Sequence, residues 1–265
     1  WLRGTAIGFP VGALPAGGGM LAVHASEGAV KRALPPELSI AAVNAPELVV
    51  VSGPEPALAA LERALEKKGT STRRLHTSHA FHSSLMDPCL DAFRAVVRTV
   101  ALSAPERPIV SCSTGTWLSD EQATDPEYWV AHLRSPVRFA DGIAALDDGS
   151  QRLLLEVGPG DTLRSLAELC TAGSESTPAV HCVRHPKEDE DDQAFLLRAL
   201  GAVWSHGVRI DWGGVHAGLD RRRVPLPTYP FERESYWVEA GHELLGSNGA
   251  APALADRKIQ DLSDW

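Results

Sequence analysis

Three histidines spaced three residues apart, His76, His79 and His82, form the densest group of reactive side chains in the sequence. They lie where a strand-like run, 70–75, gives way to a helical pattern that starts at Ser84. A histidine side chain has a pKa of about 6.5, so one of the three could act as a general base at neutral pH. Zinc is a second interpretation, but no cysteine or carboxylate stands at ligand spacing beside them, and we expect no metal. The third interpretation is that the rings only pack or form hydrogen bonds.

Composition limits the classes of protein to which the chain can belong. Its 265 residues are 44% hydrophobic and 22% charged, which is typical of a globular protein with a sizeable core. The net charge of -9 provides no basic surface for a phosphate backbone, so we expect no nucleic acid partner. The four cysteines, Cys89, Cys112, Cys170 and Cys182, are far apart and include no CxxC pair, which favours reduced thiols.

Targeting signals are not evident in the sequence. No apolar run reaches the roughly 18 residues that span a bilayer, and the start lacks the pattern of a signal peptide, so we expect a cytoplasmic protein without a membrane partner. The sequence opens with Trp1 rather than methionine. We expect residues 1–19 to be an unmatched or truncated N-terminus.

The first regular part of the sequence, 20–76, has the order β-α-β-β-α-β. The expected strands are 20–23, 38–43, 48–51 and 70–75, and the expected helices are 27–34 and 56–68. That order in fewer than 60 residues predicts a ferredoxin-like subdomain.

Strands and helices continue to alternate after residue 76, which predicts an α/β layer. The expected helices are 84–100, 128–133, 139–146, 162–170 and 193–207, and the expected strands are 107–112, 152–156 and 179–183. We expect the strand 152–156 to be buried and to end at the turn Gly158-Pro159-Gly160. The fold class is therefore α/β with an α+β insertion.

The segment Thr-Ser-His-Ala-Phe-His-Ser-Ser-Leu-Met-Asp-Pro at 77–88 resembles the motif around the active histidine in acyltransferase domains of type I modular polyketide synthases, which are similar to malonyl-CoA:ACP transacylases. Further matches occur at 43–53, 128–139 and 155–160, and together they cover 15 to about 240.

The resemblance also implies a domain organisation. Residues 77–185 would be the C-terminal part of an α/β-hydrolase-like acyltransferase core. Residues 186–240 would be the post-acyltransferase linker, which contains Pro-Thr-Tyr-Pro-Phe-Glu-Arg-Glu-Ser-Tyr-Trp at 227–237. A flexible interdomain linker would occupy 241–265.

Roles for individual residues follow from the same resemblance. His82 matches the general base, and His132 matches a residue that orients it. The His-Ala-Phe-His sequence resembles that of members selective for malonyl units, so His79 and Phe81 would contact substrate, with Phe81 narrowing the space for a methyl branch. Asn44 resembles a residue that lines the site, although a turn asparagine bonded to its own backbone is the alternative.

The family's nucleophile is a serine in Gly-His-Ser-x-Gly, and the chain contains no Gly-x-Ser-x-Gly. The resemblance places that serine, and an arginine that grips the substrate carboxylate, before the ferredoxin-like part. Arg3 does not match the arginine well enough to take that role. We therefore expect the isolated chain to be inactive. The resemblance also places several strands of the larger subdomain before the ferredoxin-like part, so we expect the isolated larger subdomain to be poorly soluble or dependent on a partner.

The resemblance implies a reaction that needs no tightly bound cofactor. A malonyl unit would pass from malonyl-CoA to the serine and then to the phosphopantetheine of an acyl carrier protein. Expected partners are that carrier protein, a ketosynthase and other synthase domains. One alternative is a non-catalytic docking module of the synthase. Another is a fatty-acid-type malonyl transferase, against which the segment 225–237 argues.

Overall fold

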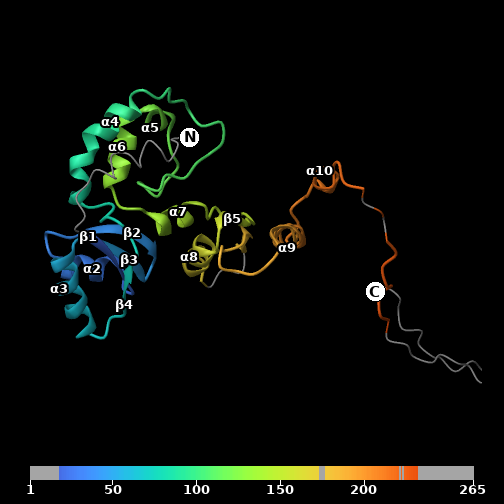
Figure 1. The fold of residues 1–265 in the computed structure, drawn as a ribbon, viewed down its shortest axis with the longest axis horizontal. Helices are drawn as coiled ribbons and strands as arrows, with labels where there is room; N and C mark the ends of the chain where they lie inside the picture. The colour runs from blue at the N-terminus through green and yellow to red at the C-terminus, as the bar shows by residue number, and fades with distance from the viewer. Residues whose placement is uncertain (1–17, 173–176, 221, 223, 232–265) are drawn as a thin grey trace, which may run out of the picture. The chain divides into compact units, whose positions relative to one another are not determined.

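The computed structural model describes residues 18–172, 177–220, 222 and 224–231. The chain divides into two compact units, Trp1–Asp211 and Trp212–Trp265, which are described separately (Figure 1). Most of the expected truncated N-terminus 1–19, and the whole of the expected linker 241–265, lie outside the described residues. None of the helices in the described part is long and apolar enough to cross a membrane.

The first unit begins with a four-stranded antiparallel sheet in the order β2-β3-β1-β4. Its elements, in chain order, are β1 (Gly18–Val23), α2 (Glu27–Ala33), β2 (Ser39–Ala45), β3 (Leu48–Pro54), α3 (Glu55–Glu66) and β4 (Thr72–Leu75). This is the β-α-β-β-α-β order that the sequence predicts, and each expected element lies within a few residues of its observed position.

One face of this sheet is closed by its own two helices. Alternate strand residues point to that face, and Leu21, Val23, Val49 and Val51 are completely buried there. They pack in one cluster with Leu58 and the other apolar residues of α3 and α2. The 58 residues from 18 to 75 therefore contain a complete hydrophobic core.

The opposite face of the sheet carries no helix of its own. The buried residues of this helix-free face are Met20, Ala22, Ala41, Ala42 and Val50. Phe81 and Val137, from later parts of the chain, pack against them. The sheet thus provides a flat surface on which the following segments are seated.

Val137 also pairs with the edge strand β2 through its backbone. The Val43 amide donates to the Val137 carbonyl and the Val137 amide donates to the Ala41 carbonyl, both at 2.8 Å. The resulting parallel bridge joins Ala42 and Val137. These bonds connect the sheet to the segment that follows α6.

A group of short helices follows the sheet. They are η1 (Ser84–Cys89), α4 (Leu90–Val97), α5 (Asp120–Thr124), α6 (Pro126–Arg134) and α7 (Phe139–Ala145). The single helix predicted at 84–100 is wrong, because Pro88 lies in the first part, which is a 3₁₀ helix, and a new α-helix begins at Leu90. The strand predicted at 107–112 is also wrong: the described chain has only one isolated bridge there, between Val110 and Trp117.

A second, parallel sheet consists of β5 (Leu154–Pro159) and β6 (Ala179–Val183), joined through α8 (Thr162–Cys170) and followed by α9 (Asp192–Ser205). The prediction that this first strand is buried is wrong, because Leu155 is 46% and Val157 77% exposed. Among the described residues β5 pairs only with β6.

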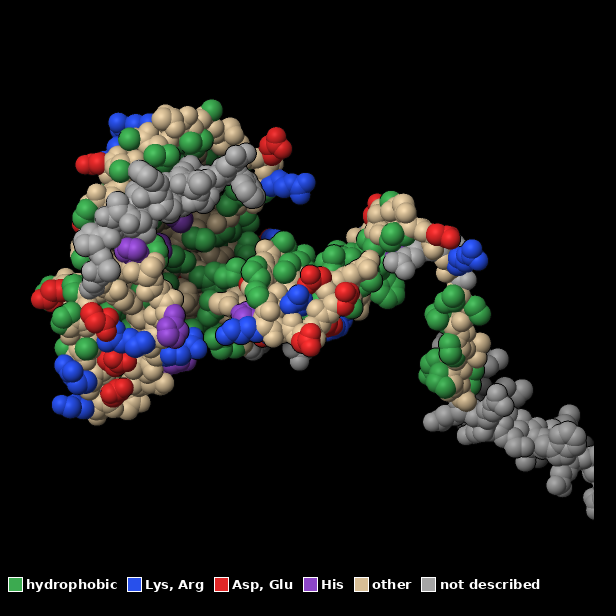
Figure 2. Space-filling model, in the orientation of Figure 1, with side chains coloured by type: hydrophobic (Ala, Val, Ile, Leu, Met, Phe, Trp, Pro, Cys, Tyr) green, Lys and Arg blue, Asp and Glu red, His purple; other side chains and the backbone are tan. Residues whose placement is uncertain are grey.

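Apolar side chains are exposed around this parallel sheet, and Figure 2 shows hydrophobic residues over this part of the first unit. Besides Leu155 and Val157 they are Leu163, Leu169, Val183, Leu196, Leu197 and Trp204. An α/β layer normally buries such residues under neighbouring strands and helices.

Among its described residues, the second unit has one short helix, α10 (Trp212–Val215). The described residues from 222 to 231 form no helix or strand, and Leu226, Tyr229 and Phe231 are exposed. The remainder of the expected 227–237 segment lies outside the described residues.

Candidate active site

His82 occupies a backbone conformation that few side chains adopt. Its φ is 59°, which is in the left-handed region, and it is the only non-glycine residue with a positive φ among those described. Such a conformation costs free energy and is retained where the surroundings enforce it, often at functional sites. The turn between β4 and η1 therefore holds His82 in one specific orientation.

Ser83 fixes this turn from within. Its completely buried hydroxyl donates to the Ala80 carbonyl at 2.6 Å and accepts from the Leu85 amide at 3.2 Å. The second bond also caps the start of η1. The residues on both sides of His82 are thus tied to one hydroxyl group.

Arg134, near the end of α6, holds the turn from outside. Its guanidinium Nη1 donates to the His82 carbonyl at 3.4 Å, and its Nε donates to the Asp87 carboxylate at 2.9 Å. The ion pair is partly exposed, so we assign it a positioning role rather than a large contribution to stability.

The environment of the His82 ring keeps it neutral. Burial lowers the pKa of His82, while a hydrogen bond to the Ser135 backbone raises it to a lesser extent and the nearby His132 lowers it further. The ring atom Nδ1 is buried and has no hydrogen-bond partner in the described structure. A neutral imidazole at neutral pH can accept a proton, which is what a general base requires.

His132 lies close enough to His82 to affect its titration, so the structure brings these two predicted site residues together. Burial lowers the pKa of His132 as well. Its ring centroid is 6.2 Å from that of Tyr128 and 6.2 Å from that of Trp129. The Trp129 indole donates to the Ala123 carbonyl at 3.0 Å, which fixes α6 against α5.

Phe81 and His79 lie beside the same turn. Phe81 packs both on the helix-free face of the sheet and against Met86 and Cys89 of η1. The His79 ring meets the Phe81 ring edge-on, at 6.1 Å between centroids. These two side chains therefore form a continuous wall beside the turn that carries His82, whereas His76 is exposed.

Asn44 is placed differently. Its backbone carbonyl accepts a hydrogen bond from the Cys170 thiol at 3.3 Å, which sets the end of β2 beside α8. Among the described residues no hydrogen bond connects Asn44 to His82 or His132. Its role as a residue that lines the site stays a prediction.

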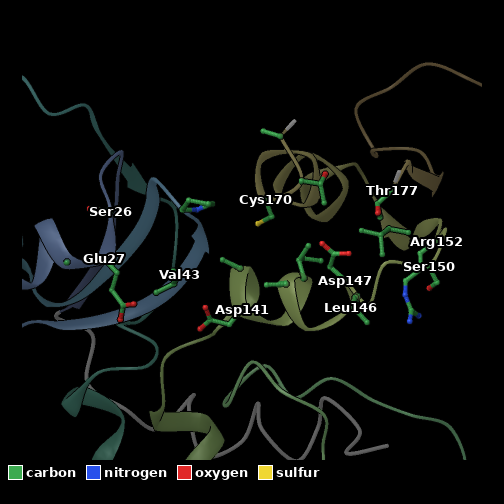
Figure 3. A pocket seen from close by; sticks show the side chains of 18 residues that line it. Ser26, Glu27, Val43, Asp141, Leu146, Asp147, Ser150, Arg152, Cys170 and Thr177 are labelled. Carbon is green, nitrogen blue, oxygen red and sulfur yellow. The ribbon is translucent and has the colours of Figure 1, made fainter. Parts of the chain in front are cut away.

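A cavity of about 780 Å³ lies between the end of β2, α7 and α8, away from the histidines (Figure 3). Two of its acidic groups are paired: Glu27 contacts Arg138 at 2.8 Å and Asp141 contacts Arg138 at 2.5 Å. Arg138 lowers the pKa of Glu27, and burial raises the pKa of the Cys170 thiol, which keeps the thiol protonated. Neither Glu27 nor Cys170 is therefore poised as a base or nucleophile, and we place the candidate chemistry at His82.

Among the described residues, no group of three or more histidine, cysteine or acidic side chains is placed to hold a metal ion.

Two positioning residues, Ser83 and Arg134, were not singled out from the sequence. Both lie inside the segments 77–88 and 128–139 that carry the family resemblance, which is the signal that could have found them.

Sequence comparison identifies the family. The model of the acyl transferase domain family matches residues 12–209, so the chain belongs to this family. Its relatives include acyltransferase regions of type I polyketide synthases. The chain is 40% identical over 240 residues to a component of the phenolphthiocerol/phthiocerol polyketide synthase of Mycobacterium tuberculosis, a match that covers 89% of the chain and 16% of that protein. It is also 40% identical over 250 residues to polyketide synthase GfsB of Streptomyces halstedii, covering 91% of the chain and 4% of that protein.

Solved structures with a similar fold are also acyltransferase domains. The acyltransferase domain from the second module of the salinomycin polyketide synthase matches with a TM-score of 0.75 and 40% identity, over 84% of this chain and 52% of that one. The acyltransferase domain of SpnD, in complex with 2-(pent-4-yn-1-yl)malonyl, matches with a TM-score of 0.69 and 42% identity, over 72% of this chain and 47% of that one. The chain thus spans about half the length of these solved domains and a small part of the curated synthases.

Proposed function

We propose that this chain supplies the base of a malonyl-transferring acyltransferase in a modular polyketide synthase. The observation that carries the proposal is His82, a half-buried imidazole with a lowered pKa, held in a left-handed turn inside the segment that resembles the family's active-site motif. A neutral, half-buried histidine suits a reaction in which hydroxyl and thiol protons must be removed in turn.

The proposed reaction has two halves. In the first, a serine hydroxyl attacks the thioester carbonyl of malonyl-CoA, His82 takes the hydroxyl proton, and the coenzyme A thiolate leaves and receives that proton. In the second, the phosphopantetheine thiol of an acyl carrier protein loses its proton to His82 and attacks the malonyl-serine ester. The serine oxygen leaves and recovers the proton, so neither half consumes a cofactor.

The neighbouring residues have supporting roles in this proposal. His132 is near enough to His82 to lower its pKa and so helps keep the base neutral. Phe81 and His79 form the wall beside the turn, where they would limit the substituent on the carbon between the two malonyl carbonyls. A pocket that excludes one methyl group discriminates by about 1–3 kcal/mol.

The nucleophile is not in this sequence, which contains no Gly-x-Ser-x-Gly. Members of a nucleophile-base pair act as a unit, so a chain with the base alone is proposed to be inactive until a serine-bearing segment joins it. In this organisation 20–76 is the small subdomain, 77–185 belongs to the large one and 186–240 is the linker. A carrier protein and a ketosynthase in the cytoplasm would be the partners.

The test is transfer of labelled malonyl to a carrier protein by a complete domain, made by joining this chain to the serine-bearing half of the salinomycin second-module acyltransferase. His82→Ala should reduce the rate by roughly 10²–10⁴-fold, the usual contribution of a general base. The matched control is His76→Ala, which removes an exposed histidine just before the same motif and should retain activity. Equal activity of the two variants would refute the proposal.

A non-catalytic docking module is the second candidate, because apolar residues of β5, α8 and α9 are exposed. That candidate predicts no effect of His82→Ala on transfer. It also predicts that Leu155→Ser and Val157→Ser weaken binding to a neighbouring synthase domain, as measured by calorimetry. A fatty-acid-type transferase has weaker support, since the relatives at 40% identity are polyketide synthases.

A further inference from the structure

β1 begins at a glycine that lies unusually close to the histidine turn. A Cβ atom at Gly18 would stand 2.7 Å from the Ala80 Cβ, 2.6 Å from the Leu85 Cδ1 and 3.0 Å from the Gly53 carbonyl oxygen. Contacts below 3.0 Å essentially never occur for real Cβ atoms, so a side chain here would force its neighbours to move. The Leu85 methyl can swing aside, but the Ala80 Cβ is attached directly to the backbone of the turn.

Ala80 and Leu85 lie at the two ends of the hydrogen-bonded turn. Ala80 is 1% exposed and its carbonyl accepts the Ser83 hydroxyl, while the Leu85 amide donates to the same hydroxyl. A displacement of Ala80 is therefore transmitted through Ser83 to the residue between them, His82.

The face of the sheet on which Gly18 lies supports the same conclusion. Met20 and Ala22, which follow Gly18 at the spacing of one strand face, belong to the helix-free face that Phe81 covers. Gly18 thus continues the surface on which the residue next to His82 is seated.

We propose that Gly18 is a positioning residue for His82: its lack of a side chain sets how closely the turn 80–85 approaches β1. The turn's close approach to the sheet buries the imidazole ring and fixes its orientation. The contacts of Gly18 support its effect on the position of His82, and the effect on catalysis rests on the proposed function.

Gly19 provides a matched control in the same strand. A Cβ there would lie 2.8 Å from the Glu55 carboxylate and 3.5 Å from the Leu58 Cδ1, on the helix-covered face. The Glu55 carboxylate is the end of a flexible, exposed side chain and can move away. Gly19→Ala therefore adds the same methyl group to β1 without displacing the turn 80–85.

The experiment is NMR of the full chain with isotope-labelled histidine, in which His82→Gln assigns the His82 signal. In Gly18→Ala we expect the His82 signal to move and its pKa to rise toward the ordinary histidine value, because the displaced ring loses burial, the main cause of its lowered pKa. Gly19→Ala should leave both unchanged. Gly18→Ala/Ala80→Gly removes the Ala80 Cβ and leaves the Leu85 methyl, which can swing aside, and the Gly53 carbonyl oxygen at 3.0 Å. This double variant should restore the native signal.

An unchanged His82 signal and titration in Gly18→Ala would overturn the proposal, as would a double variant that fails to restore them. If Gly18→Ala and the double variant both fail to fold while Gly19→Ala folds, the contact serves the fold alone and the proposal is also overturned.

Transfer by the complete domain separates this inference from the proposed function. Gly18→Ala should slow transfer by up to about 100-fold, as expected for a catalytic group misplaced by about 1 Å. A moved His82 signal with undiminished transfer in both Gly18→Ala and His82→Ala would support the positioning role and refute His82 as the base.

Discussion

The two sheets of the first unit differ in how completely they are covered. In the antiparallel sheet, Leu21, Val23, Val49 and Val51 are completely buried under helices from the same 18–75 segment. In the parallel pair, β5 alternates between half-buried and exposed residues along its whole length.

The difference follows from topology. An antiparallel β-α-β-β-α-β unit supplies both its strands and the helices that cover them within a short segment. Parallel strands lie in the interior of an α/β layer and depend on strands and helices from elsewhere to cover both faces. The first sheet is therefore expected to be stable by itself, whereas the second depends on additional strands.

The largest expected effect comes from shortening one leucine in each region. Leu58→Ala, in the closed core, should lower the free energy of unfolding by about 2–5 kcal/mol, because it leaves a cavity among buried neighbours. Leu155→Ala, on exposed β5, should change it by less than about 0.5 kcal/mol. Urea unfolding followed by circular dichroism measures both, and similar losses in the two variants would contradict the comparison.

Replacing one glycine in each sheet by alanine should give a smaller difference in the free energy of unfolding. Gly53, at the end of β3, has a φ of 154°, and a Cβ there would stand 2.6 Å from the Leu38 side chain and 2.9 Å from the Glu37 carbonyl oxygen. Gly53→Ala should cost about 1–3 kcal/mol in thermal or urea unfolding. A Cβ at Gly158 of β5 would meet nothing within 4 Å, so Gly158→Ala should remain within about 0.5 kcal/mol of the parent. A larger cost at Gly158 than at Gly53 would reverse our interpretation of the two sheets.

The smallest expected effect is a pH dependence of the free energy of unfolding that comes from His82 and His132, on the segments that follow the antiparallel sheet. Burial lowers the pKa of both His82 and His132 below the ordinary value of 6.5, so the unfolded chain binds more protons as the pH falls below that value. The contribution of these two histidines to the free energy of unfolding should be fully present above about pH 6.5. It should be lost as the pH falls through their pKa values in the folded protein.

Urea midpoints measured between pH 8 and pH 5 test this dependence. His82→Gln should flatten the curve, while His76→Gln, which changes an exposed histidine, should leave it as in the parent. A parent curve that is already flat over this range would show that the pair is not buried in solution.

The sequence predicted the antiparallel unit well because its signals are local. Period-two burial in the strands and the spacing of Leu58, Leu61 and Leu65 in α3 depend only on nearby residues. The prediction at 84–100 was wrong because apolar residues on both sides of Pro88 follow the spacing of one helix, although the proline and the 3₁₀ geometry of η1 divide it.

The site was predictable only in part. The resemblance selected His82 and His132, which the structure brings together, but spacing along the chain does not reveal that His82 adopts a left-handed backbone. Nor does it show that Gly18 meets Ala80, which lies more than 60 positions away. The exposure of β5 was likewise not predictable, since it depends on which strands lie beside it rather than on its own residues.

The pairing of Val137 with β2 has a consequence for recombination between related synthases. Both of its hydrogen bonds join backbone atoms, so they form whatever side chains a donor relative carries at 41, 43 and 137. Replacing 18–75 with the equivalent segment of a relative would preserve this backbone pairing without redesign. The joint between Gly18 and Ala80 depends on two small residues facing each other, so a chimera must take both from the same parent.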